Sequence, residues 1–184
     1  TSGEGEGAQF EDTSVRRVER ALLEAALSYY KDESRNNKKA KQGSNKTAAP
    51  HLTARFHFKR AYYSEVRRDA ASAAKHWQAC YVALRELLRA VMSPSPETER
   101  SLVRLSEIKR VAEFVNRKIS SAAFNGMRLA EACDVFRRHI RLFRYVISGP
   151  STQSSASTAS TAAAAHVHHG WLCKQYRTFA KTLE

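Results

Sequence analysis

The sequence predicts an all-α protein, a short α-solenoid of tetratricopeptide-like antiparallel helix pairs. Apolar residues recur at spacings of three and four through most of the 184 residues, which is the period of helices with one buried face. No stretch alternates between apolar and polar residues as a half-buried strand would. Proline and glycine divide the helical runs at Pro50, Pro96, Gly126 and Gly149.

An internal repeat favours a solenoid over a general helical bundle. Three core positions recur at identical spacing in two helices: Ala73, Trp77 and Cys80, then Ala132, Phe136 and His139. The second set follows the first by 59 residues, and a further small residue precedes each set by twelve positions, Ala61 and Ser120. Small residues at such positions let the paired helices of tetratricopeptide-type repeats approach closely. The separation exceeds the 34 residues of that repeat, so we expect long helices and loops.

Composition points to acidic partners without identifying one. The formal net charge is +13 and the isoelectric point is near 10.0, which suits nucleic acid or an anionic membrane. The three widely spaced cysteines do not form a disulfide framework and fit a reducing compartment. No apolar run approaches the roughly 20 residues that span a bilayer. The chain begins with Thr1, so we expect a fragment of a longer protein.

The first part of the chain predicts one helix between two flexible segments. Residues 1–9 are glycine-rich and are expected to form a disordered tail. Apolar residues at helical spacing predict a helix from about Thr13 to Lys31, with Asp12 or Thr13 as its cap. Residues 34–49 contain basic residues and no acid, and we expect a flexible basic linker there.

Two helices follow, which Asp69 separates. Pro50 begins the first, and Asp69 is the expected N-cap of the second. The apolar face of the first helix is Leu52, Phe56, Ala61, Tyr62 or Tyr63, and Val66. The apolar face of the second is Ala73, Trp77, Cys80, Leu84, Leu87 and Val91.

A second pair and a final helix complete the prediction. Pro96 suits the first turn of a long helix, Asn125-Gly126 a tight turn, and Gly149-Pro150 the end of the next helix. The apolar faces are Leu105, Ile108, Ala112, Val115, Ile119 and Ala122, and then Leu129, Cys133, Phe136, Ile140, Phe143 and Ile147. Residues 150–165 are expected to be a flexible low-complexity insertion, followed by a helix from about Gly170 to the end.

The stretch VFRRHIRLFRYVIS, residues 135–148, has two interpretations. Its aromatic residues fall on the core face of the helix, so we expect packing rather than base stacking. Four arginines occupy the other sides: Arg137, Arg138, Arg141 and Arg144. They are either a solvated face whose long stems cover apolar surface, or a face that binds an acidic partner. The spacing alone leaves both interpretations open.

No catalytic or metal site emerges. His166, His168, His169 and Cys173 suit zinc chemically, but the sequence has neither the zincin arrangement nor a CxxC pair. Cys80 and Cys133 lie on apolar faces, and no orienting acid or oxyanion hole is recognisable near Cys173. We therefore predict no catalytic residue, no cofactor and no metal ligand. No nucleic-acid reader motif is present, although the basic linker suits non-specific binding to RNA or anionic lipid.

Five segments together resemble a known family. YYKDESRNNKKAK (29–41) resembles its tyrosine–acid–basic helix, and FHFKRAYYSEVRRDAASAAKHWQACYVALREL (56–87) its signature helix pair. LSEIKRVAEFVNRKIS (105–120), AEACDVFRRHIRLF (130–143) and HHGWLCKQYRTFA (168–180) follow in the family's order. The chain is thereby identified as a member of the foie gras domain family of the trafficking protein particle (TRAPP) complex, with the helical domain over 10–184. The basic linker and the serine–alanine insertion depart from the family pattern.

The resemblance implies a scaffold rather than an enzyme. TRAPP is a tethering complex of ER-to-Golgi transport and an exchange factor for Rab GTPases, in which small core subunits catalyse exchange. Implied partners are other TRAPP subunits, indirectly a Rab GTPase, and peripherally an anionic membrane. A cytoplasmic location, peripheral to early Golgi and ER–Golgi intermediate membranes, is likewise implied. The resemblance also assigns His139 to a packing motif, as a buried, hydrogen-bonded histidine. The alternative from the residues alone is a basic helical protein that binds RNA or anionic membrane directly.

Overall fold

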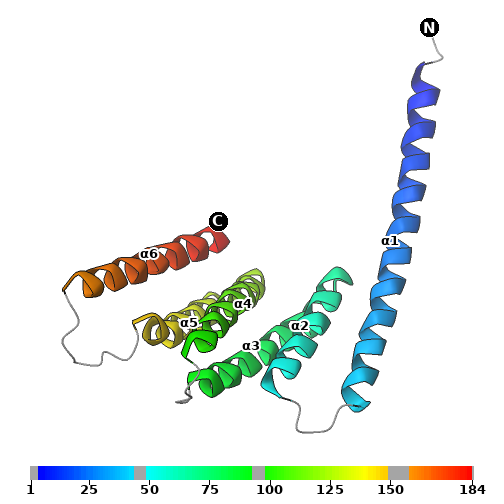
Figure 1. Cartoon of the computed structure of the whole chain (residues 1–184). Coiled ribbons are helices and arrows are strands. Elements are labelled where there is room, and N and C mark those ends of the chain that lie inside the picture. The colour runs from blue at the N-terminus through cyan, green and yellow to red at the C-terminus, as the bar shows by residue number, and fades with distance from the viewer. Residues whose placement is uncertain (1–3, 44–48, 93–97, 149–157, 184) are drawn as a thin grey trace.

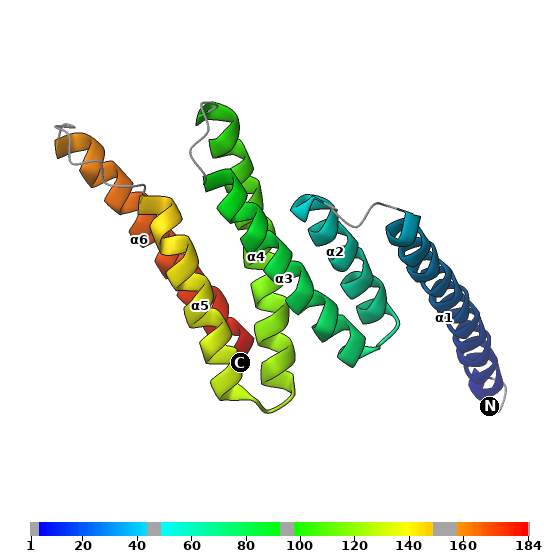
Figure 2. The ribbon, with the colours of Figure 1, turned by 90° about the horizontal axis from the view of Figure 1, so that it is seen from below.

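The structure is an array of helices that follow one another in chain order. The computed structural model describes residues 4–43, 49–92, 98–148 and 158–183. Within these residues every regular element is a helix: α1 (Glu4–Gly43), α2 (Pro50–Val66), α3 (Ala70–Met92), α4 (Thr98–Asn125), α5 (Leu129–Ser148) and α6 (Thr158–Leu183). Each packs on the next, and α6 also packs on α4, so the array runs from α1 at one end to α6 at the other (Figures 1 and 2). The predicted all-α helical-repeat fold is confirmed.

The internal repeat is present in both packing and backbone. All eight residues of the two sets are buried: Ala61, Ala73, Trp77 and Cys80, and Ser120, Ala132, Phe136 and His139. The turn between α2 and α3 places Arg68 at φ 58°, and the turn between α4 and α5 places Met127 at the same value. In each turn an amide bonds a carbonyl five residues earlier, Asp69 to Ser64 and Arg128 to Ala123, both at 2.9 Å. Both helices therefore end in the same left-handed cap.

Helix ends agree with several local predictions. α2 begins at Pro50, and the Asp69 carboxylate accepts the Ser72 amide at 3.0 Å as the N-cap of α3. Hydrogen bonds from the Ser72 side chain and from its backbone amide lower the pKa of Asp69. The turn after Asn125 is also confirmed, although Met127 rather than Gly126 takes the left-handed conformation. The predictions at Pro96 and at Gly149-Pro150 lie outside the described residues.

Three segments expected to be flexible are helical where they are described. Residues 4–9 and 34–43 belong to α1, and residues 158–165 belong to α6. Alanine, glutamate and lysine extend an existing helix at little cost, because the unfavourable nucleation step has already been made. Asn37 adds a tertiary reason, since its side-chain amide donates to the Phe56 carbonyl at 3.2 Å and ties α1 to α2.

Some predicted apolar faces are exposed rather than buried. Val15, Val18, Leu22 and Leu23 of α1 are between 47 and 66 % exposed, because α1 packs on α2 alone. Leu52 and Leu129, each in the first turn of its helix, are 46 and 50 % exposed. Helical periodicity identifies the side of a helix that is apolar. Burial also requires that a neighbouring helix covers that side at the same position along the helix axis.

Candidate partner-binding face

A groove lies between α3 and α5, with Ile119 of α4 at its base. Its volume is about 740 Å³. The lining consists of Gln78, Tyr81, Val82, Arg85 and Met92 from α3, and Glu131, Val135, Arg138, Arg141 and Leu142 from α5. We call this the α3–α5 groove. It is formed by the second helices of the two repeated pairs, so the repeat itself creates it.

The groove presents apolar surface to solvent. Val82 and Met92 are each 52 % exposed, and Val135 and Leu142 are half-buried. Single exposed apolar side chains are common, whereas a grouped set in a concavity is the form that partner-binding surfaces take. This floor suits an apolar stripe on another protein.

Arginines flank that apolar floor. Arg85, Arg138 and Arg141 are exposed. The acid in the lining, Glu131, is already paired with Arg128 at 2.7 Å, so the groove carries a net positive charge. Such a distribution complements an acidic surface and favours its approach.

Only two of the four arginines of the predicted face line the α3–α5 groove. All four are exposed, but the groove includes Arg138 and Arg141 and not Arg137 and Arg144. The Arg137 guanidinium lies 3.9 Å from the Asp134 carboxylate. Arg85 was missed from the sequence because only the packing of α3 and α5 against α4 brings it to the same groove.

A part-buried hydrogen bond joins Tyr81 in the lining of the groove to the buried His139. The Tyr81 hydroxyl and His139 Nδ1 lie 2.9 Å apart, and His139 is fully buried. Burial, with a smaller contribution from the charge of Lys109, lowers the pKa of His139 to about 4, so its ring is neutral at pH 7. Burial also raises the pKa of Tyr81, against the opposing effect of Arg85 and Arg138. The prediction of a buried, hydrogen-bonded histidine at 139 is confirmed.

The candidate zinc residues are not brought together where they are described. His169 and Cys173 are exposed on α6, whereas the side chains of His166 and His168 lie outside the described residues. In the described part of the chain, no three His, Cys, Asp or Glu side chains are placed to hold a metal ion. The Cys80 thiol is buried, donates to the Ala54 carbonyl and has its pKa raised to about 12 by desolvation. It therefore stays protonated and is a poor nucleophile.

The segments that carried the family resemblance pack against one another. The Trp171 indole of α6 donates to the Glu113 carboxylate of α4 at 2.6 Å, and Lys109 lies over the same ring at 4.8 Å. The Asn37 bond to Phe56 connects the first segment to the second. These contacts join residues that are far apart in the chain, so the resemblance follows one continuous structural unit.

Comparison with known proteins finds relatives that are named for the same complex. No protein-family model matches the chain. It is 32 % identical over 165 residues to "Trafficking protein particle complex subunit 11" of Gallus gallus and of Bos taurus, and 31 % identical to the subunit of that name from Homo sapiens. Each match covers 90 % of this chain and 12 % of the relative, so the chain spans about an eighth of the length of these proteins. None of the helices described is both long and apolar enough to cross a membrane.

Proposed function

The chain is a domain related to subunit 11 of the trafficking protein particle complex, and on this premise we propose that it is a scaffold within such a complex. Its role is to bind other subunits of the tethering complex in ER-to-Golgi transport. It performs no chemistry itself, and the Rab nucleotide exchange that the complex supports is catalysed by other subunits. It acts at membranes of the early secretory pathway without spanning them.

The observation that carries this proposal is the extent of the similarity. It covers 165 residues, 90 % of the chain, rather than one short motif. Similarity of that extent applies to the packed helical array as a whole. Helical-repeat proteins commonly use such extended surfaces to bind partners.

The α3–α5 groove is the surface that we propose for partner binding. It combines an apolar floor with the exposed guanidinium groups of Arg85, Arg138 and Arg141. A helix or ridge with an apolar stripe and acidic flanks complements both features. The partner in this proposal is an acidic surface of another subunit of the complex.

Reversing the charge of the three arginines of the α3–α5 groove tests whether partner subunits bind there. We expect the triple change Arg85→Glu, Arg138→Glu and Arg141→Glu to reduce recovery of other TRAPP subunits on the immobilised chain by at least about tenfold, because it places acids opposite acids. The matched control reverses three exposed cations on other helices, Lys59, Arg104 and Lys181. Circular dichroism of both variants checks that the helical array is intact.

The control also separates the proposal from direct binding to RNA or anionic lipid. Both triple variants change the net charge equally, so non-specific electrostatic binding would fall to a similar extent in both. Loss of subunit recovery in the groove variant alone supports the groove. Equal recovery by the groove variant and the unchanged chain would show that this face is not the binding surface.

A further inference from the structure

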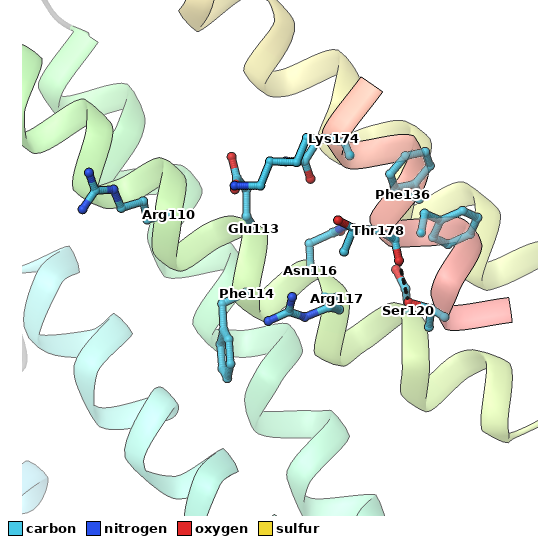
Figure 3. Close-up of a pocket in the computed structure, with 12 residues that line it drawn as sticks. Arg110, Glu113, Phe114, Asn116, Arg117, Ser120, Phe136, Lys174 and Thr178 are labelled. Carbon is cyan, nitrogen blue, oxygen red and sulfur yellow. Dashed lines mark hydrogen bonds between the residues drawn. The ribbon is translucent and has the colours of Figure 1, made fainter. Parts of the chain in front are cut away.

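The two ends of the helical array differ in what they expose. At one end α6 packs on α4 and α5, and Lys174 and Thr178 of α6 line a pocket over α4 (Figure 3). Asn116 and Ser120 of α4 line the same pocket, and their unpaired side-chain oxygens are fully enclosed. In the described part of α6, Tyr176 is the one large apolar side chain that is exposed.

The other end of the array is α1, which exposes far more apolar surface. Five large apolar side chains of this helix are exposed: Val15, Val18, Leu22, Leu23 and Tyr29. The terminal unit of a helical-repeat array normally has a polar outer face, which keeps the array soluble. The surface of α1 is instead that of an interior helix, which has a neighbour on two sides.

Only one of these two sides of α1 is covered, by α2. The Tyr30 ring lies 6.2 Å from that of Tyr62 and 5.7 Å from that of Tyr63, and Ser34 is buried. A second set of apolar residues is exposed on another side of the helix, roughly a third of a turn around its axis. We call this set the α1 stripe: Val15, Val18, Leu22, Ala25 and Tyr29.

The spacing of the α1 stripe is complementary to a second helix. Its members are separated by three, four, three and four residues, which is the spacing of the apolar seam between two packed helices. An extended strand would instead present every second residue to a partner. The stripe therefore suits an amphipathic helix from another molecule.

The charged residues that border the α1 stripe are acidic. Glu19 and Glu33 lie along one edge, and Asp32 follows the last turn of the stripe. Arg35 lies 3.3 Å from Asp32, but both are more than 60 % exposed, and such surface pairs are weak. Within residues 14–33 the cations lie on the other side of α1: Arg16, Arg17, Arg20 and Lys31. Cations beside the seam of an incoming helix would therefore be attracted to this edge.

These acids disfavour the other occupants of an exposed apolar face. The phosphates of an anionic membrane or of RNA would meet Glu19 and Glu33 at the contact. Two copies of the chain packed through their stripes would bring the same acids together. We infer that the α1 stripe binds an amphipathic helix of a partner protein whose apolar seam is bordered by lysine or arginine. This surface is separate from the α3–α5 groove and attracts a partner of the opposite charge.

Two synthetic helices test this inference with the full 184-residue chain. Both are fluorescein-labelled peptides of three heptads with the same seam of leucine and isoleucine. One has lysine at the positions that border the seam, and the other has glutamate there. Fluorescence anisotropy should show the lysine helix binding at least about tenfold more tightly. Non-specific attraction to a chain with a net charge of +13 predicts the reverse order.

A matched pair of variants locates the contact. Val18 in the stripe and Val103 of α4 are 59 and 57 % exposed, so lysine at either position should leave the circular dichroism spectrum unchanged. Val18→Lys should weaken binding of the lysine helix at least about tenfold, because it places a charge within an apolar contact. Val103→Lys changes the net charge equally and should have little effect. The triple groove variant described above should still bind the lysine helix, because the groove lies elsewhere.

Three results in these assays overturn the inference. They are no binding of either helix, binding of the glutamate helix as tightly as the lysine helix, and equal weakening by Val18→Lys and Val103→Lys. Sedimentation velocity of the chain alone adds a fourth. Dimers that Val18→Lys abolishes would mean that a second copy, rather than a basic partner helix, covers the stripe.

Discussion

Replacing Trp77 with alanine should destabilise the chain by about 3–5 kcal/mol, the range for large aromatic residues removed from a core. Trp77 is 1 % exposed, and its indole N–H donates to the Glu65 carboxylate at 3.2 Å. Its ring meets Phe58 of α2 edge-on at 5.1 Å and Phe114 of α4 at 5.8 Å between centroids. The Trp77 side chain on α3 therefore contacts both α2 and α4. Its removal leaves a cavity between these three helices.

Urea unfolding followed by circular dichroism measures this loss. The control is Val82→Ala, on the same helix at a position 52 % exposed, where we expect a change within about 0.5 kcal/mol. Domain stabilities are about 5–15 kcal/mol, so the Trp77 variant should lose a substantial part of the stability of the chain at 25 °C. A loss below about 1 kcal/mol would contradict the packing described at this residue.

Acidification from pH 7.5 to 4.5 should reduce stability by about 2–3 kcal/mol through His139 alone. The ring is fully buried, and its pKa falls from 6.5 to about 4 on folding, chiefly through desolvation. The unfolded chain therefore binds a proton below about pH 6.5 that the folded chain does not. The stabilisation is present above about pH 6.5 and is lost as the pH falls towards about 4. Each pH unit in that window corresponds to about 1.4 kcal/mol.

The variant His139→Gln isolates this effect. Glutamine retains polar atoms for the Tyr81 hydroxyl and does not titrate. Unfolding free energies measured at pH 7.5, 6.5, 5.5 and 4.5 should fall more steeply for the unchanged chain than for the variant. The lowered pKa of Asp69 acts below its ordinary value of 3.8 and does not affect this window. Parallel curves would show that His139 titrates with its ordinary pKa in the folded chain.

Much of the fold could be predicted because its determinants are local. Pro50 sets the start of α2, and Asp69 caps α3 through a bond to an amide three residues away. The equal spacing around Trp77 and Phe136 predicted two similar helix pairs. Their turns also proved alike, with Arg68 and Met127 at the same φ of 58°. Neither an arginine nor a methionine side chain predicts a left-handed conformation, so the similarity of the two turns could be seen only in the structure.

Helix length and burial depend on more than the local pattern. Basic and alanine-rich composition suggested flexibility over 34–49 and 150–165, although such residues also extend a helix well. The apolar residues of α1 have the period of a core-facing helix, yet Val15 and Leu22 are 55 and 66 % exposed. Periodicity reports the orientation of side chains around a helix axis and contains no information about which neighbour is present.

The binding surfaces could be predicted only in part. Helical spacing showed that Arg138 and Arg141 leave the core face, but Arg85 joins them only because α3 and α5 both pack on α4. Asn116 lies within the family-like segment 105–120. Its lack of a partner, like that of Ser120, becomes apparent only when α6 is placed over α4. Unsatisfied polar atoms are a property of tertiary structure, and no sequence signal marks them.

Affinity capture from a cell lysate tests the scaffold function most directly. The full chain is immobilised at moderate salt, and retained proteins are identified by mass spectrometry with and without nuclease. We expect other TRAPP subunits to be recovered in amounts that nuclease does not change. Recovery mainly of RNA-associated proteins that nuclease removes would contradict the scaffold function. The net charge of +13 would then be the property that matters.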